Sequence, residues 1–140
     1  MSPVTLPFFV YGTLRPGEPN HDAFLRGRVL MEQPAVFGGG VLYDGPGYPY
    51  VVEEPGEVVR GELVTPRPEE YGALLAVLDR LEEYAPGDPR NLYERVEREV
   101  TRVADGSGVR AWVYVAAPAV AARLRARGTL IEGGDWTARR

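Results

Sequence analysis

The chain has 140 residues, of which 44% are hydrophobic and 26% charged, and its formal net charge is −4. These values are typical of one globular domain with a sizeable core, so we expect a single domain over residues 1–140. The negative charge and the lack of a long basic block argue against nucleic acid as a partner. No apolar run is long enough to span a membrane and no signal peptide precedes Phe8, so we expect a cytoplasmic protein.

Several reactive residue types are absent. The sequence contains no cysteine and no lysine, and all 16 basic residues are arginines. Thiol nucleophiles, thiolate metal sites and Schiff-base chemistry are therefore excluded. His21 is the only histidine, which excludes a histidine-rich zinc site. A Ser-His-Asp triad would require Ser107 to meet His21, which we do not expect. An enzyme built on this chain would use carboxylates, tyrosines and backbone N–H groups.

The most informative stretch lies near the start of the chain. The run Phe8–Tyr11 predicts a buried strand that ends at Gly12, a residue that lets a ligand approach the main chain. Thr13 and Leu14 then offer backbone N–H groups without an evident strand partner, and Pro16-Gly17 closes the segment as a turn. Free N–H groups after a strand suit a carboxylate or a developing oxyanion. An ordinary strand and turn is the alternative interpretation.

The remaining pattern predicts strands grouped around one long helix. After the opening loop we expect a short helix that Asn20 caps and that ends at Gly27, with His21 on its surface. Gly38–Gly40 indicates a bulge or bend, and Pro49 restricts its segment to a sheet edge or bulge. We expect strands at 35–44, 48–52, 57–65, 93–101 and 109–115, and helices at 66–84 and 118–124. This order favours an α+β fold with a mostly antiparallel, barrel-like sheet and flanking helices.

The helix at 66–84 carries a carboxylate on its apolar side. Its stripe consists of Tyr71, Leu74, Leu75, Leu78 and Leu81. At about 100° per residue, Glu82 falls about 20° from Tyr71, whereas Glu83 falls about 120° away and should face solvent. Burial would raise the pKa of the Glu82 carboxyl and suit it to general acid–base catalysis near neutral pH. Two alternatives remain: the helix frays after Leu81, or Glu82 pairs with a structural arginine.

Motifs spread along the chain resemble those of the gamma-glutamylcyclotransferase-like family. The segment Tyr11–Gly17 resembles the family's signature loop, and Leu78–Tyr84 resembles its L-D-x-x-E-G-Y helix end. Further matches in family order are 40–44 with 47–49, the Y-x-R segment 93–95, and the closing Gly134-Asp135-Trp136. Glu83 departs from the pattern, which usually has glycine at that position, and this could alter the helix end.

The resemblance implies a function and a site. It implies a small barrel-like sheet with flanking helices and a site between the signature loop and a glutamate, which is Glu82 here. Backbone groups of Tyr11, Gly12, Thr13, Leu14 and Arg15 would hold a gamma-glutamyl group, whose own α-amino group closes the ring of 5-oxoproline and releases an amine.

This chemistry requires no metal and no cofactor, and the partner would be a small gamma-glutamyl molecule. A non-catalytic binding protein and a gamma-glutamyl hydrolase are the alternatives, and the oligomeric state and leaving amine stay open. We expect most of the aromatic residues to be core or sheet residues rather than pocket walls; they are Tyr43, Tyr48, Tyr50, Tyr93, Trp112 and Tyr114.

Overall fold

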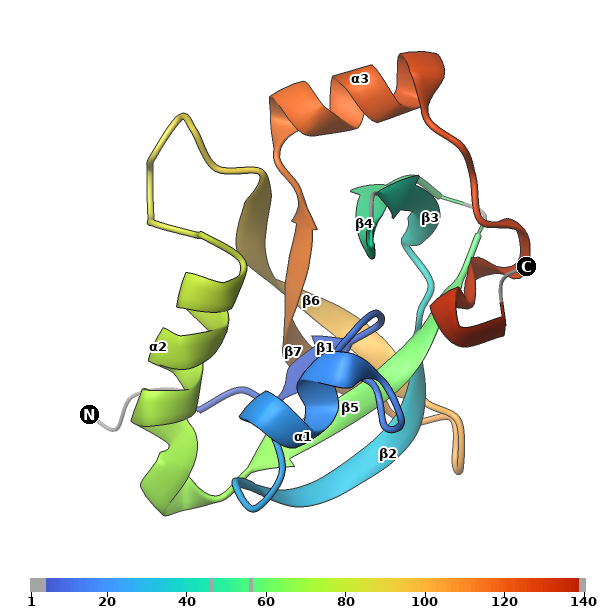
Figure 1. Cartoon of the computed structure of the whole chain (residues 1–140). Coiled ribbons are helices and arrows are strands. Elements are labelled where there is room, and N and C mark those ends of the chain that lie inside the picture. The colour runs from blue at the N-terminus through green and yellow to red at the C-terminus, as the bar shows by residue number, and fades with distance from the viewer. Residues whose placement is uncertain (1–4, 46, 56, 139–140) are drawn as a thin grey trace.

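A closed five-stranded barrel forms the centre of the molecule. The computed structural model describes residues 5–45, 47–55 and 57–138, and Figure 1 shows their arrangement. The barrel strands are β1 (Phe8–Val10), β2 (Val29–Phe37), β5 (Val59–Pro66), β6 (Tyr93–Arg102) and β7 (Gly108–Ala116), in the order β1-β5-β2-β6-β7. All pairs are antiparallel except the closing one, in which β1 runs parallel to β7 with Phe8 opposite Trp112. The predicted α+β, barrel-like fold is confirmed.

A separate two-stranded sheet contains β3 (Gly40–Gly45) and β4 (Tyr48–Glu53). The glycine run separates β2 from β3, as expected of a bend. A Cβ at Gly40 would lie 2.9 Å from Val51 Cγ1 and 3.1 Å from the Phe37 ring, so the chain turns there against packed side chains. Pro49 lies in β4, where a two-stranded sheet leaves an outer edge for a residue that cannot donate a hydrogen bond.

Three helices flank the strands: α1 (Pro19–Phe24), α2 (Tyr71–Leu81) and α3 (Pro118–Arg127). The expected helix at 66–84 is shorter, because a 3-10 turn at Pro68–Glu70 precedes α2 and the α-helix ends at Leu81. The expected cap of α1 was also wrong. Glu18 is the N-cap residue and Pro19 takes the first helical position, which suits its fixed φ and missing N–H. Short 3-10 turns at Glu132–Gly134 and Trp136–Ala138 follow α3.

Strand β1 supplies two hydrophobic cores because its side chains alternate between two faces. Phe8 and Val10 pack in a cluster with Leu74 and Leu78 of α2, whereas Phe9 enters a cluster with Trp136. Trp136 is 1% exposed and anchors the C-terminal segment in this cluster. Strand β1 is therefore held on both faces, and the loop that follows it starts from a fixed point. In the part of the chain that the structure describes, no helix has the length and apolar character needed to cross a membrane.

Candidate active site

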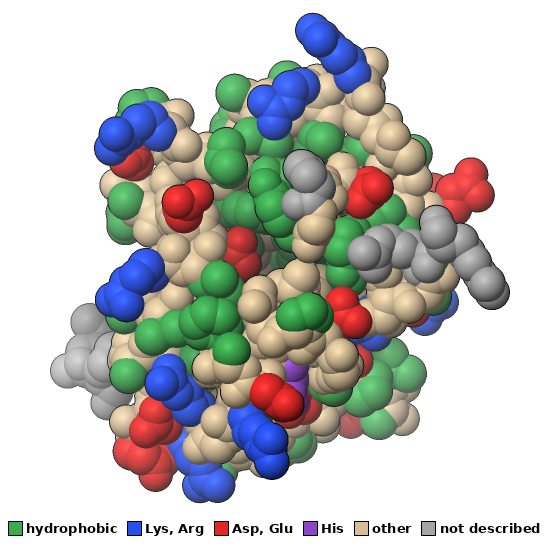
Figure 2. Space-filling view, in the orientation of Figure 1, with side chains coloured by type: hydrophobic (Ala, Val, Ile, Leu, Met, Phe, Trp, Pro, Cys, Tyr) green, Lys and Arg blue, Asp and Glu red, His purple; other side chains and the backbone are tan. Residues whose placement is uncertain are grey.

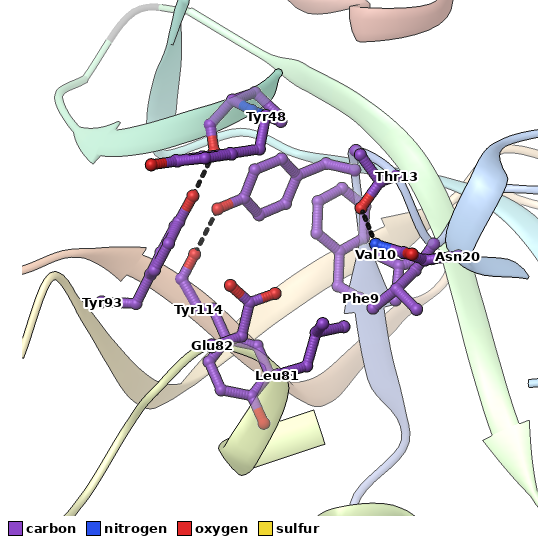
Figure 3. A pocket seen from close by; sticks show the side chains of 13 residues that line it. Phe9, Val10, Thr13, Asn20, Tyr48, Leu81, Glu82, Tyr93 and Tyr114 are labelled. Atoms are coloured by element: carbon purple, nitrogen blue, oxygen red, sulfur yellow. Dashed lines mark hydrogen bonds between the residues drawn. The ribbon is translucent and has the colours of Figure 1, made fainter. Parts of the chain in front are cut away.

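A pocket of about 120 Å³ lies where β1 ends, beside the end of α2 and strand β4. Figure 3 shows it from close by, and Figure 2 shows hydrophobic side chains gathered around a hollow on this side of the molecule. Its lining comes from segments far apart in the sequence and consists of Phe9, Val10, Tyr11, Gly12, Thr13, Leu14, Asn20, Tyr48, Pro49, Leu81, Glu82, Tyr93 and Tyr114. The folded chain thus brings Glu82 and most of the signature loop into one cavity.

Glu82 occupies the C-cap position of α2, where the helix stops. The Tyr84 N–H donates to the Asp79 carbonyl at 2.8 Å, and the Glu83 N–H donates to the Arg80 carbonyl at 3.1 Å. This pair of bonds is a Schellman motif, which requires a left-handed residue after the cap, and Glu83 has φ of +53°. The helix does end after Leu81, as one alternative suggested. The turn nevertheless leaves Glu83 exposed and Glu82 directed into the pocket (Figure 3).

The Glu82 carboxylate has no hydrogen-bond or ion-pair partner among the residues that the structure describes. Its burial raises the pKa of the Glu82 carboxyl from 4.5 to about 7. The alternative, that Glu82 pairs with a structural arginine, is therefore wrong. Arg95 pairs with Asp79 instead, and its Nε donates to Asp79 Oδ1 at 2.8 Å. An unpartnered carboxyl with a pKa close to neutral can both accept and donate a proton under ordinary conditions.

Tyrosine phenols surround the carboxylate. The Tyr93 hydroxyl donates to the Pro49 carbonyl at 2.7 Å, and the Tyr11 hydroxyl donates to the Tyr114 carbonyl at 2.5 Å. Burial raises the pKa values of the Tyr11, Tyr93 and Tyr114 phenols above the usual value of 10, and the Glu82 charge raises them further. These hydroxyls are therefore neutral and engaged within the protein, so they act as walls of the pocket.

The signature loop forms the opposite part of the cavity. Tyr11, Gly12, Thr13 and Leu14 line it, and within the described residues no acceptor binds the N–H groups of Thr13 and Leu14. A Cβ at Gly12 would lie 2.7 Å from Pro49 Cδ. Glycine is therefore needed here to make room for the Pro49 ring, and not because the backbone is left-handed. The matched segment 47–49 and the signature loop, which are separate motifs in the sequence, therefore pack directly on each other.

Arg15 lies outside the pocket lining. Its Nε donates to Glu62 at 2.7 Å and its Nη1 donates to Asp135 at 2.7 Å. The side chain therefore joins the signature loop to β5 and to the closing Gly134-Asp135-Trp136 segment. Partial burial lowers the pKa of the guanidinium, but the hydrogen bonds to Glu62 and Asp135 and the charges of these carboxylates outweigh it, so the net pKa is raised.

Asn20 and three tyrosines are lining residues that were not predicted as part of the site. Asn20, expected as a helix cap, instead donates from Nδ2 to Thr13 Oγ1 at 2.8 Å. Tyr48, Tyr93 and Tyr114 lie in strands, as expected, and Tyr93 and Tyr114 belong to a buried core cluster. All three also line the pocket. Tyr48 and Tyr93 fall within matched motif segments, which was the available signal. Tyr114 lies in an alternating strand, where nothing in the local pattern distinguishes a pocket wall from a packed residue.

His21 was expected as a surface residue and is instead partly covered. Its Nε2 lies 2.8 Å from a Glu32 oxygen, and its side chain is 16% exposed. Partial burial lowers the pKa of the imidazole, but the Glu32 and Asp22 carboxylates outweigh it, so the net pKa is raised. The described residues contain no group of three or more histidine, aspartate or glutamate side chains placed to hold a metal ion.

The small closed barrel thus holds the Glu82 carboxylate, without a partner in the part of the chain that the structure describes, opposite a loop with free N–H groups, which is an arrangement suited to binding a small polar molecule. Comparison with known proteins makes this specific, because the family model described as gamma-glutamyl cyclotransferase, AIG2-like, matches residues 8–138. The chain belongs to that family. The resemblance expected from the motifs is confirmed.

Two relatives of the chain have names that agree with this family. The chain is 39% identical over 108 residues to the gamma-L-glutamyl-butirosin B gamma-glutamyl cyclotransferase of Niallia circulans, covering 76% of this chain and 64% of that one. A second relative, a gamma-glutamylcyclotransferase by name from Halalkalibacterium halodurans, is 41% identical over 99 residues. This match covers 69% of this chain and 78% of the relative's chain. This chain thus spans less than two thirds of the butirosin relative.

The crystal structure of an AIG2-like protein from mouse has the same fold. It superposes with a TM-score of 0.62 and 24% identity, and the match covers 81% of this chain and 80% of that chain.

Proposed function

We propose that this protein is a gamma-glutamylcyclotransferase that acts on a small gamma-glutamyl amine or peptide. The α-amino nitrogen of the substrate attacks its own γ-carbonyl carbon, and a five-membered ring forms through a tetrahedral intermediate. The bond between that carbon and the leaving nitrogen then breaks, giving 5-oxoproline and a free amine. Because the nucleophile belongs to the substrate, the lack of cysteine and lysine in this chain is no obstacle, and the protein mainly folds the substrate onto itself.

Glu82 is the proposed proton carrier. As a carboxylate it takes one proton from the α-ammonium group, which frees the nitrogen lone pair for attack. As a carboxylic acid it returns that proton to the leaving nitrogen. The ring nitrogen loses its second proton to the released amine, which departs as an ammonium ion, so no proton is gained or lost by the protein over the cycle. Burial raises the pKa of Glu82 to about 7, which lets both forms exist near neutral pH.

The signature loop is the proposed electrostatic partner. Backbone groups of the loop, from Tyr11 to Leu14, would hold the gamma-glutamyl group, and the N–H groups of Thr13 and Leu14 have no other acceptor among the described residues. Such donors stabilise the negative charge that develops on the γ-carbonyl oxygen, and removal of one typically costs about 3–4 kcal/mol of transition-state stabilisation. The route requires neither a metal nor an organic cofactor.

One observation carries the proposal: Glu82 is an unpartnered carboxylate in a small pocket, facing the signature loop. A buried carboxyl without a partner destabilises the fold, so its presence in this pocket favours a chemical role. The test is product analysis with gamma-glutamyl dipeptides and gamma-glutamyl-capped amines, the latter included because a relative's name specifies gamma-glutamyl-butirosin. We expect 5-oxoproline from the wild type and a loss of at least about 100-fold in kcat for Glu82→Gln.

Other products would support the alternatives. Glutamate in place of 5-oxoproline would show that water attacks, which makes the protein a hydrolase. Ligand binding without turnover in both wild type and Glu82→Gln would indicate a binding protein. Equal 5-oxoproline release by wild type and variant would remove Glu82 from the mechanism. Glu83→Gln is the matched control, since Glu83 is the next residue and is exposed.

A further inference from the structure

Arg95 on β6 holds the turn that carries Glu82 from both ends. Its guanidinium binds the Asp79 carboxylate with two hydrogen bonds, from Nε to Oδ1 at 2.8 Å and from Nη2 to Oδ2 at 3.2 Å. The same guanidinium lies over the Tyr84 ring, with Cζ 5.4 Å from the ring centroid. Asp79 and Tyr84 are the two ends of the Schellman motif, joined by the bond from the Tyr84 N–H to the Asp79 carbonyl at 2.8 Å. Glu82 lies between them, so one side chain of the barrel contacts the turn on either side of this carboxyl.

The Arg95 side chain is itself held in place. Its guanidinium also stacks over the Trp112 ring of β7, with Cζ 4.4 Å from the centroid, and the side chain is only 14% exposed. Trp112 Nε1 donates to the Tyr71 hydroxyl at 3.0 Å, and that hydroxyl donates to the Leu6 carbonyl at 2.9 Å. A guanidinium that is bound by a carboxylate through two nitrogens and stacked on aromatic rings makes contacts that a lysine does not reproduce.

Tyr114 connects this ion pair to the wall of the pocket. Its hydroxyl donates to Asp79 Oδ1 at 2.6 Å, and Figure 3 shows Tyr114 next to Glu82 in the pocket lining. Burial raises the pKa of the Tyr114 phenol most, the hydrogen bond to Asp79 and the Asp79 charge raise it further, Arg95 lowers it, and Glu82 raises it. One phenol thus interacts with all three charges, so the Arg95–Asp79 pair lies close to the Glu82 carboxyl.

The two charges of the pair cancel beside Glu82. Asp79 alone would be a second carboxylate within one helical turn, and it would disfavour ionisation of Glu82. With Arg95 bound to Asp79, burial accounts for the raised pKa of Glu82. Phenols from the neighbouring strands and the signature loop also interact with the Glu82 charge, and they stay neutral because their pKa values are raised; they are Tyr11, Tyr50, Tyr93 and Tyr114.

We propose that Arg95 is a positioning residue for Glu82: from the barrel wall it fixes the turn that carries the carboxyl and cancels the Asp79 charge beside it. Arg95 does not line the pocket, so it acts through Asp79 and Tyr84 and not on the substrate. A proton carrier works only within hydrogen-bond reach of the reacting atoms, and the conformation of the turn sets that reach. The catalytic consequence rests on the proposed function, in which Glu82 carries the proton.

Two substitutions separate the charge of Arg95 from its shape. Arg95→Lys keeps the charge but loses the paired hydrogen bonds and the stacking on both rings. We expect its kcat to fall at least about 10-fold, with the acid limb of kcat/KM unchanged, because a displaced carboxyl transfers protons less well. Arg95→Met removes the charge as well, so its acid limb should also move up by about 0.5–1 pH unit. Carboxyl ¹³C NMR of the free protein follows the Glu82 titration directly and requires no substrate.

Arg98→Met is the matched control, because Arg98 lies on the same strand and binds Glu53 through the same two nitrogens, Nε at 2.7 Å and Nη2 at 3.0 Å, on the exposed side of the barrel. It should leave kcat and the Glu82 titration unchanged. A double variant that combines Asp79→Asn with Arg95→Met removes both charges and should return the acid limb to its wild-type pH.

Two results would overturn the proposal: wild-type kcat in Arg95→Lys, or a Glu82 titration in Arg95→Met that matches the wild type. Arg95→Lys retains the ion pair with Asp79, so it decides the question by itself if Arg95→Met does not fold. An upward shift of the Glu82 titration in Arg95→Met, in a protein that releases no 5-oxoproline from any substrate, would overturn the proposed function and leave the coupling between Arg95 and Glu82 standing.

Discussion

The Arg95 guanidinium is bound by the Asp79 carboxylate, with Nε 2.8 Å from Oδ1 and Nη2 3.2 Å from Oδ2. The guanidinium also stacks over the Trp112 ring at 4.4 Å, and the Tyr114 hydroxyl donates to the same Asp79 oxygen at 2.6 Å. Asp79 precedes Glu82 by three residues, which places both carboxylates on neighbouring parts of the last turn of α2. Asp79 therefore neutralises the partly buried Arg95, which lies on the strand next to the end of α2.

Replacing Asp79 with Asn should change both stability and the pH profile. The variant leaves the Arg95 charge without its partner, and we expect a loss of about 3 kcal/mol in the free energy of unfolding. The uncompensated cation favours ionised Glu82, so the acid limb of kcat/KM should move to lower pH. Denaturant titration and a pH–rate profile check the two effects. Glu53→Gln breaks the exposed pair with Arg98 and should cost less than about 1 kcal/mol. An unshifted acid limb in Asp79→Asn would contradict the electrostatic role.

Glu82 should make the wild type less stable as the pH rises through neutrality. Folding raises the pKa of its carboxyl from 4.5 to about 7, so the folded state binds more protons between these values. The free energy of unfolding therefore falls as pH increases across this window, by up to about 3 kcal/mol. Glu82→Gln has no carboxyl to ionise, so its free energy of unfolding does not fall in this way. The difference in free energy of unfolding between the variant and the wild type should therefore shift in favour of the variant from pH 4 to pH 8. Parallel denaturation curves at both pH values would contradict the assignment, and Glu83→Gln should keep the wild-type slope.

Glu83 occupies a backbone conformation that favours glycine. Its φ of +53° is required by the Schellman motif that ends α2 and directs Glu82 inward. We expect Glu83→Gly to raise the free energy of unfolding by about 0.5–1 kcal/mol, with kcat unchanged. Gly87→Ala is the reverse control, because Gly87 has φ of +74° and open space around it, and it should lose a similar amount. A destabilised Glu83→Gly would mean that the Glu83 side chain makes a stabilising contribution larger than the backbone strain.

Gly12 should not tolerate a side chain. An added Cβ would lie 2.7 Å from Pro49 Cδ, so Gly12→Ala must displace either the signature loop or β4. We expect a loss of about 1–3 kcal/mol in stability and a raised KM, measured by denaturation and steady-state kinetics. Gly38→Ala is the matched control, since nothing lies within 4 Å of its added Cβ. Wild-type KM in Gly12→Ala would show that the contact with Pro49 does not position the loop.

The sequence by itself determined the class of fold and the key residues of the candidate site. Apolar alternation and turn residues placed most strands, and the stripe from Tyr71 to Leu81 placed Glu82 on the buried side of α2. These inferences succeed because local periodicity fixes which way a side chain points relative to its own element. Periodicity did not locate the end of α2 at Leu81, because Glu82 itself is the cap residue.

Only the tertiary structure decided which groups share the pocket and which are engaged elsewhere. Arg15 and Asn20 lie five residues apart, yet one pairs with Glu62 and Asp135 while the other clamps Thr13 inside the cavity. The local pattern around Tyr114 does not distinguish a pocket wall from a core residue. Tyr114 lines the pocket because β7 pairs with β1 and closes the barrel. The physical reason is that these partners are separated by up to 120 residues. Their meeting depends on strand pairing and packing across the whole chain, which local sequence does not encode.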